Sequence, residues 1–184
     1  MQIKIVESEG VSQAIDEATS TFFSGNREAV ERHFEGHAEG NSSTLFGYKD
    51  GELVGILTIR WHSRNPVLRR QNIPLIQNIE IKHDRRGQGL GNELMEHAER
   101  YAAARTERIA ICVSISAAFG AAQRLYAKRG YIPDGQGVTK VYEPAERGAL
   151  VRLEPLRDGQ IVEVNGDLQL WLIKNLKVEN DSRI

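Results

Sequence analysis

The sequence has only one cysteine, Cys112, and therefore cannot form an internal disulfide or a metal site made of several thiolates. Lysine and arginine (24) almost balance aspartate and glutamate (25), and the net charge of −1 does not point to a nucleic acid or a membrane surface as the main partner. Apolar runs are short: none approaches the ~20 residues of a membrane-spanning helix, and the first residues lack a secretory signal pattern. We therefore expect a cytoplasmic enzyme or binding protein, with no nucleic acid and no membrane as partner.

The composition is that of a globular protein, with 40% apolar and 27% charged residues, and a length of 184 residues predicts a single domain, 1–184. Hydrophobic periodicity predicts both strands and helices. The expected strands are residues 2–6, 44–48, 53–59, 75–81, 109–113, 138–142, 160–164 and 168–174. The expected helices are residues 11–18, 26–39, 90–102 and 117–129. Residues 61–73 are expected to form a polar, basic loop, and residues 178–184 a frayed end.

The order of these elements indicates an α/β fold. Asp50-Gly51 and Asn165-Gly166 are typical of tight turns between antiparallel strands. Between residues 75 and 129, strand, glycine-rich loop, helix, strand and helix follow one another, which is the βαβα order of a right-handed parallel crossover. We therefore predict a mixed, mostly antiparallel central sheet flanked by helices.

A glycine-rich loop follows the predicted strand 75–81. Gly87, Gly89 and Gly91 stand at alternate positions, so the backbone can adopt unusual dihedrals and a ligand can approach its N–H groups closely. The following helix directs its unpaired N–H groups and its positive dipole end to the same place, which favours a phosphate. The loop matches neither of two familiar nucleotide motifs: a P-loop needs Lys and then Ser or Thr after the glycines, and the dinucleotide fingerprint needs Gly at Asn92.

Two motifs together resemble the GNAT acetyltransferase superfamily. The first is Arg86-x-x-Gly89-x-Gly91, and the second, at residues 122–131, contains Leu-Tyr followed by Gly130, with Tyr131 where the family usually has Phe. The resemblance implies the GNAT fold, with an acetyl-CoA-binding core at residues 75–137 and a C-terminal β segment at 138–176. It also implies acetyl-CoA as co-substrate and no metal.

The resemblance further implies where the cofactor binds. The pyrophosphate would be held by Arg86, Gly87, Gln88, Gly89, Leu90 and Gly91. Backbone groups of Ile79 and Ile81 would run beside the pantetheine as an added strand does. Tyr126 would contact the cofactor and protonate the departing sulfur, because a phenol with a pKa of ~10 keeps its proton at neutral pH. The alternative for Tyr126 is a purely packing role, and Phe119 replaces an Asn that contacts the cofactor in many family members.

Glu80 is the leading candidate for the general base. It is the one acid in the apolar run 75–81, and alternation along a strand places it on the face opposite Ile79 and Ile81. Asn78 would share its face and could orient the acceptor. A solvated or salt-bridged position is the alternative for Glu80, and His83 is the rival base.

Several other residues have side chains that could bind the acceptor, ligate a metal or act as a nucleophile. Arg60 and Trp61 begin a basic run that is a candidate for acceptor binding, with a solvated loop as the alternative. His33 and His37 have helical spacing but not the order of a zinc-protease motif, so we expect exposed histidines and no metal site. Cys112 lies in an apolar strand and is expected to be a small buried hydrophobe.

We therefore expect an N-acetyltransferase that transfers the acetyl group of acetyl-CoA to a primary amine of a small molecule or peptide, by direct attack in a ternary complex. The alternative is a non-catalytic acyl-CoA-binding module with a sensing or regulatory role. The C-terminal β segment could pair with that of a second copy to form a homodimer. The identity of the acceptor does not follow from the sequence.

Overall fold

One eight-stranded sheet runs through the molecule in the order β1-β2-β3-β4-β5-β8-β6-β7. The computed structural model describes residues 1–146 and 149–176, so the expected frayed end, 178–184, lies outside the described residues. The strands are β1 (Gln2–Ile5), β2 (Ser42–Lys49), β3 (Glu52–Arg60), β4 (Leu75–Ile81), β5 (Arg108–Ser114), β6 (Ile132–Tyr142), β7 (Arg152–Pro155) and β8 (Leu168–Asn175). Neighbouring strands are antiparallel except for β4 and β5, which are parallel. The predicted mixed, mostly antiparallel sheet is confirmed.

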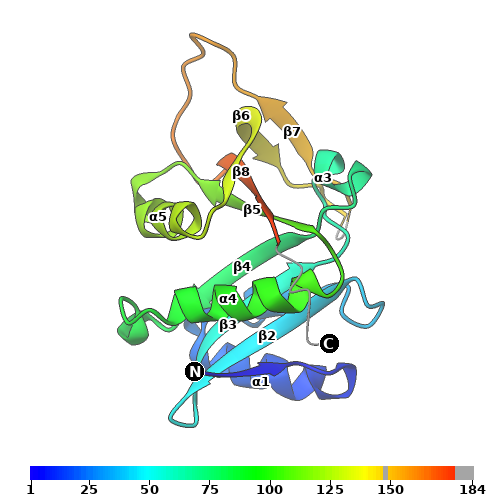
Figure 1. Ribbon diagram of the computed structural model, residues 1–184, viewed down its shortest axis with the longest axis vertical. Coiled ribbons are helices and arrows are strands. Elements are labelled where there is room, and N and C mark those ends of the chain that lie inside the picture. Colours follow the sequence, from blue (N-terminus) through cyan, green and yellow to red (C-terminus); the bar gives the residue numbers. More distant parts are fainter. Residues whose placement is uncertain (147–148, 177–184) are drawn as a thin grey trace, which may run out of the picture.

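Helices flank this sheet, with α1 and α2 on one side and α4 on the other (Figure 1). Their bounds are α1 (Val11–Thr21), α2 (Arg27–Phe34), α3 (Pro66–Arg70), α4 (Leu90–Ala103) and α5 (Gly120–Lys128). Helix α2 is shorter than the predicted 26–39: Asn26 caps its start by accepting a hydrogen bond from the Ala29 N–H, and Gly36 adopts a φ of +75° soon after its end.

Residues 61–73 are not the simple loop that their polarity predicted. They contain α3, which begins with Pro66 at its first position, while the Asn65 side chain accepts hydrogen bonds from the N–H groups of Val67 and Leu68. A capping Asn followed by Pro is a typical helix start. Leu68 of this helix is completely buried.

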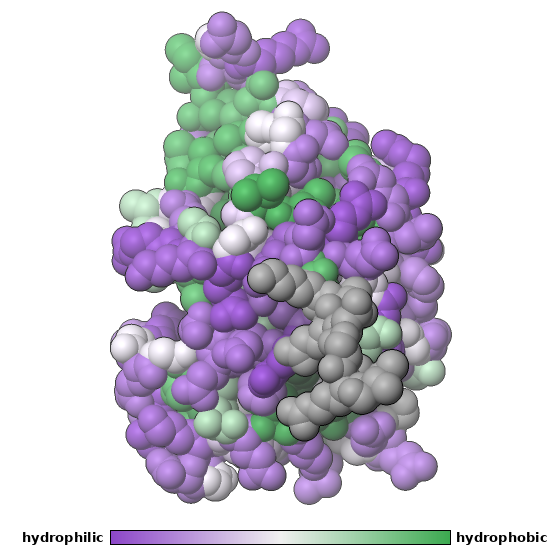
Figure 2. Space-filling view, viewed as in Figure 1, coloured by the Kyte–Doolittle hydropathy of each residue, from purple (hydrophilic) through white to green (hydrophobic). Residues whose placement is uncertain are grey.

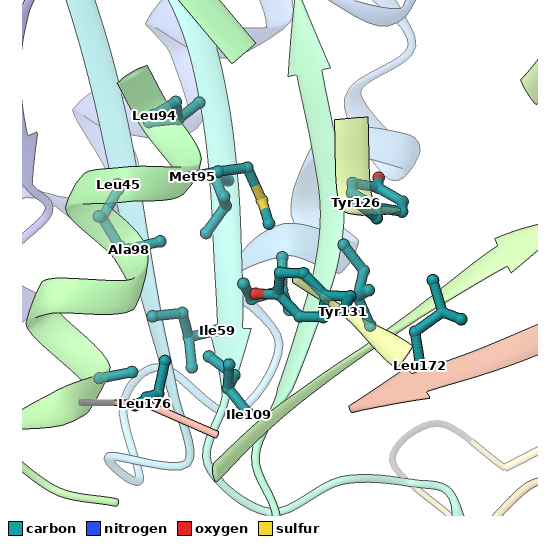
Figure 3. Close-up of a cluster of buried hydrophobic side chains, with 14 of the residues drawn as sticks. Leu45, Ile59, Leu94, Met95, Ala98, Ile109, Tyr126, Tyr131, Leu172 and Leu176 are labelled. Atoms are coloured by element: carbon teal, nitrogen blue, oxygen red, sulfur yellow. The ribbon is translucent and has the colours of Figure 1, made fainter. Parts of the chain in front are cut away.

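The main apolar core lies between the sheet and α4. Helix α4 contributes a stripe of buried side chains, namely Leu90, Leu94, Met95, Ala98 and Ala102. They pack on residues of the central strands, and Tyr126 and Tyr131 complete the cluster with ring centroids 6.1 Å apart (Figure 3). A second cluster fills the space between α1, α2 and strands β2 and β3. Of these two clusters, the first contains residues of β4, namely Ile76, Ile79 and Ile81.

The C-terminal β segment differs from its prediction in two places. The expected strand at 160–164 is wrong, because these residues have no regular secondary structure and Ile161 is 98% exposed. Strand β7, by contrast, was not predicted. The Asn165 side chain accepts a local hydrogen bond from the Asp167 N–H, so Asn-Gly closes a turn without a preceding strand. The surface in Figure 2 is mostly hydrophilic, with apolar side chains gathered at the end of the molecule where this segment projects.

Candidate active site

Strands β4 and β5 separate in the middle of the sheet. Their ladder pairs only Leu75 with Ala110 and Ile76 with Ile111. Beyond this point Asn78 adopts a φ of +54°, and the register of β4 against β3 shifts, which marks a β-bulge that bends the strand. In the described part of the chain, the rest of β4 therefore has no strand partner on its β5 side. Its backbone groups are available to pair with an extended ligand.

The bulge corrects one prediction about the faces of β4. Gln77 lies opposite Thr58 and Glu80 lies opposite Ile56, and these two β3 residues share the sheet face that packs under α1 and α2. Gln77 therefore shares the face of Glu80. Simple alternation assigned this place to Asn78, which lies in the bulge and is exposed. A positive φ at a non-glycine residue inside a strand is not visible in a hydrophobic pattern, so the sequence missed Gln77.

The glycine loop joins β4 to α4 through a short turn at His83–Arg85. Gly87 and Gly89 have φ values of +77° and +82°, which other residues rarely adopt, and a Cβ at either position would meet only open space. These glycines are therefore required by the backbone path and not by packing. No described side chain caps α4, and the N–H groups of residues 88–91 have no backbone acceptor in the described chain. The loop can thus receive an anion on its N–H groups.

Three charged side chains fix the start of this loop. Glu52, at the beginning of β3, forms an ion pair with Lys82 and a 2.6 Å contact with the Arg85 guanidinium. The Lys82 N–H also donates to the Val54 carbonyl at 2.9 Å. The turn before the glycines is consequently held against β3, so the loop has a defined position at the end of β4.

Arg86 and Glu80, which the sequence assigned to different roles, are in contact. The Arg86 guanidinium donates to the Ile81 carbonyl at 3.0 Å and to the Glu80 carboxylate at 3.3 Å. Partial burial raises the pKa of Glu80, and the Arg86 charge opposes this shift without cancelling it. A carboxylate with a raised pKa holds a proton more readily than an exposed one, which suits a general base.

Tyr126 projects from α5 into the core beside β4, and only 4% of its surface is exposed (Figure 3). Burial raises the pKa of its hydroxyl, and the Glu80 carboxylate raises it further. The phenol therefore keeps its proton at neutral pH. Both roles considered from the sequence, packing and proton donation, are compatible with this position.

A buried ionic cluster beside Tyr131 had no signal in the sequence. The Glu99 carboxylate of α4 accepts two hydrogen bonds from Arg129, at 2.9 and 2.8 Å, and one from Lys174 of β8 at 2.6 Å. Burial raises the pKa of Glu99, but these bonds outweigh it and hold the pKa below its usual range. The partners are 30 and 75 residues away in sequence, so no local motif reveals them.

Arg60 and Trp61 do not lie in a solvated loop. Arg60 ends β3 and is buried, and its donors are used by Glu35, Gln77 and the Arg32 carbonyl. This network fastens the end of α2 to the sheet. Its contact with Gln77 nevertheless brings it to the edge of the opening in β4.

Trp61 packs with Tyr101 and Arg105, whose guanidinium lies 4.6 Å from the indole ring centroid. Tyr101 lies near the C-terminal end of α4, about three turns from the glycine loop at its N-terminal end. The structure therefore does not bring Trp61 together with the loop residues.

The remaining candidates have clearer positions. His83 is exposed in the turn after β4, and Phe119 is 44% exposed just before α5. Cys112 packs in the cluster around α3, where burial raises the pKa of its thiol to about 12, so the thiolate is disfavoured at neutral pH.

The expectation that His33 and His37 are exposed is wrong, because both are buried. His33 Nδ1 pairs with the Thr58 hydroxyl at 3.1 Å, and His37 Nε2 pairs with the Val6 carbonyl at 2.9 Å. Apolar residues are widely spaced in the sequence around these two histidines, so the hydrophobic pattern does not predict their burial. No group of three or more potential metal ligands occurs among residues 1–146 and 149–176.

Comparison with known proteins identifies the family of this chain. The model of the acetyltransferase (GNAT) family matches residues 11–131, and the chain therefore belongs to this family and is an acyltransferase. A search of curated proteins gives no match.

Solved structures share the fold at low sequence identity. An N-acetyltransferase from Staphylococcus aureus Mu50 superposes with a TM-score of 0.61 at 13% identity, over 96% of this chain and 98% of that one. The ribosomal-protein-S18-alanine N-acetyltransferase from Escherichia coli gives 0.60 at 14% identity, over 100% and 99%. A GNAT-family acetyltransferase from Streptococcus pneumoniae gives 0.57 at 21% identity, over 96% and 100%. These similarities support the fold, while the acceptor requires separate evidence.

Proposed function

We propose that the protein transfers the acetyl group of acetyl-CoA to a primary amine of a small molecule or peptide, by direct attack within a ternary complex. One observation supports this proposal above all. The stretch of β4 beyond its short ladder with β5 leads directly into the glycine loop, carries Glu80, and contributes Ile79 and Ile81 to the core cluster that contains Tyr126. A ligand that carries both an extended amide chain and a pyrophosphate fits this combination, and acetyl-CoA has both.

The chain offers suitable groups for each part of acetyl-CoA. The uncapped N–H groups of residues 88–91, with Arg86 beside them, would hold the pyrophosphate, and backbone groups of Ile79 and Ile81 would pair with the pantetheine amides. Bound acetyl-CoA supplies the activated acetyl group. The protein supplies its orientation relative to the amine, which accounts for much of the rate of such transfers.

Two proton transfers complete the proposed reaction. Glu80, directly or through a water, takes a proton from the protonated amine, and the freed amine nitrogen forms a bond with the thioester carbonyl carbon. As the carbon–sulfur bond breaks, Tyr126 gives its proton to the sulfur and recovers one from the nitrogen through solvent. Overall, a protonated amine and acetyl-CoA give an amide, CoA and one proton.

The acceptor site would lie along the opening beside Glu80. Asn78, exposed in the bulge, is a candidate for contacting the acceptor, and Arg60 could act there through Gln77. Trp61 stays a weaker candidate because of its position at the far end of α4. The Escherichia coli neighbour acts on an alanine of a ribosomal protein, so N-terminal peptides deserve a place in any acceptor screen.

The test is a thiol-release screen with acetyl-CoA against amino acids, polyamines, aminoglycosides and N-terminal peptides. We expect at least one amine to release CoA, and we expect Tyr126→Phe and Glu80→Gln to reduce turnover while acetyl-CoA binding persists. Tyr142→Phe, at a partly exposed position of β6, and Glu96→Gln, at an exposed position of α4, are matched controls. Binding of acetyl-CoA without release by any amine would instead favour a non-catalytic acyl-CoA-binding role.

Two further expectations stay predictions. A homodimer would be tested by sedimentation, and the exposed apolar side chains near residues 156–167 are the first place to look for its interface.

No helix of the described residues is long and apolar enough to cross a membrane. A cytoplasmic location rests on the sequence alone.

A further inference from the structure

We propose that Arg129 is a positioning residue that fixes α5, and with it the Tyr126 hydroxyl, relative to the glycine loop (residues 86–91). This inference rests on the acetyltransferase function proposed above. Arg129 would act through Tyr126 and not by touching the reacting atoms. The geometry of three elements, α4, α5 and β8, leads to this role.

Helices α4 and α5 carry the two halves of the proposed site and are distinct elements that run in different directions (Figure 1). The glycine loop runs into the first turn of α4, whereas Tyr126 belongs to α5. They approach at Gly91, where an added Cβ would lie 3.6 Å from Leu125. Because the sulfur of a cofactor held on α4 must meet a hydroxyl carried by α5, the reaction requires a fixed relation between these helices.

Arg129 connects the helices at two levels of α4. Its guanidinium donates to Glu99 through two nitrogens, and its third nitrogen donates to the Asn92 side chain at 2.6 Å and to the Asn92 carbonyl at 3.1 Å. Asn92 lies in the first turn of α4, immediately after the glycines. A single side chain therefore joins α5 to the loop end of α4 and to its middle.

Arg129 is also joined directly to Tyr126 through the backbone. The Tyr126 carbonyl accepts hydrogen bonds of 3.1 Å from the N–H groups of Arg129 and Tyr131. These residues form the C-terminal cap of α5, one turn after Tyr126. A displacement of the guanidinium would consequently move the helix end on which the phenol depends.

The role requires the shape of arginine as well as its charge. The planar guanidinium directs donors to Glu99 and to Asn92 at once, whereas the ammonium of lysine is a point charge that can satisfy only one of these places. Arg129→Lys should therefore keep a charge beside Glu99 and lose the link to Asn92. Asn92→Ala removes the side-chain part of the same link at an exposed helix position that tolerates Ala well.

Lys174→Met provides the matched control. Lys174 bonds the same Glu99 oxygen from β8, so its loss weakens the cluster without disturbing the link between α4 and α5. We expect Arg129→Lys and Asn92→Ala to lower kcat about tenfold with the KM for acetyl-CoA changed less than about twofold. Lys174→Met should lower the melting temperature more than Asn92→Ala does while keeping kcat within about twofold of wild type.

A purely structural role would give a different result. If kcat follows the melting temperature across the three variants, or if Arg129→Lys retains full kcat, the positioning role is wrong. The kcat of Arg129→Lys and Asn92→Ala should also keep the wild-type dependence on pH, because neither change alters Glu80.

A second measurement does not depend on turnover. We expect acetyl-CoA to slow amide hydrogen exchange both in the glycine loop and in α5 of the wild type and of Lys174→Met, but only in the loop of Arg129→Lys. Equal protection of α5 in Arg129→Lys would overturn the positioning role. Protection without turnover on any amine would overturn the proposed reaction alone, and absence of acetyl-CoA binding would overturn both.

Discussion

Two glutamates that contact arginine behave in opposite ways in this protein. Glu80, on β4, meets Arg86 through one 3.3 Å hydrogen bond, and its pKa is raised. Glu99, on α4, receives three bonds of 2.6 to 2.9 Å from Arg129 and Lys174, and its pKa is lowered although it is more deeply buried.

The difference shows that burial alone does not decide the protonation of a carboxyl group. At Glu99 the donors more than compensate for the lost water, so the carboxylate is charged at neutral pH and holds elements together. At Glu80 a single, longer contact compensates only in part, so the group can exchange a proton. We therefore propose that the Glu99 region serves stability and the Glu80 region serves chemistry.

The largest expected effect is on the Glu99 side of this comparison. Arg129→Met leaves a buried carboxylate with one of its two partners, and should lower the free energy of unfolding by roughly 3 kcal/mol in urea titrations at neutral pH. Arg100→Met, at an exposed position of α4, should change the free energy of unfolding by less than about 0.5 kcal/mol.

The sign of the pH dependence adds a second check. A lowered folded-state pKa means that the ionised Glu99 stabilises the fold above its unfolded-state pKa and that this stabilisation is lost as pH falls through the folded-state value. The difference between wild type and Arg129→Met should therefore shrink towards acid pH. A constant difference would show that the effect comes from lost packing.

The next effect concerns catalysis at Glu80. Glu80→Gln should reduce kcat about 100-fold, because an amide cannot accept the amine proton. It should leave the urea midpoint almost unchanged, since the Glu80–Arg86 contact is long and partly exposed. Full activity with the same pH profile would remove Glu80 as the base and return attention to exposed His83.

A smaller effect tests the Glu80–Arg86 contact itself. In wild type, activity should rise with pH through the pKa of Glu80. Arg86→Gln removes the charge that opposes the raised pKa, so the acid limb of kcat should move up by about half a pH unit at saturating acetyl-CoA. Arg100→Gln serves as the control, and a limb that moves to lower pH would contradict the assignment.

The smallest effect concerns a third acid, Glu52, which like Glu99 has two cationic partners. It pairs with Lys82 and Arg85 as Glu99 pairs with its partners, but it is far more exposed. Glu52→Gln should shift the melting temperature by less than about 2 °C, and the shift should disappear in ~0.5 M salt, because water and ions screen such pairs. A salt-independent loss as large as that of Arg129→Met would mean that partner number, and not burial, sets the stability.

Much of the fold could be predicted because its signals are local. The strand before the glycine loop, the loop and the stripe of α4 each lie within one short stretch, and the prediction of strand 75–81 agrees with β4 to the residue. The strand expected at 160–164 failed because its apolar residues have nothing to pack against in the structure, and local pattern carries no information on such partners.

The site could be predicted only in part for the same reason. The motifs indicate Arg86 and Tyr126 as candidates, since each motif lies within a short stretch of sequence. The bulge at Asn78 and the Glu99–Arg129 contact depend on backbone twist and on residues distant in sequence, which no periodicity records. The pKa difference between Glu80 and Glu99 likewise arises only when the chain is folded.

The most direct test of this account is a side-chain carboxyl titration by carbon-13 NMR, with Glu80→Gln and Glu99→Gln used to assign the two signals. The account predicts that Glu80 titrates at a higher pH than an exposed glutamate and Glu99 at a lower pH. Titration of Glu80 at or below the pH of Glu99 would contradict the separation of a proton-exchanging carboxyl from a structural one.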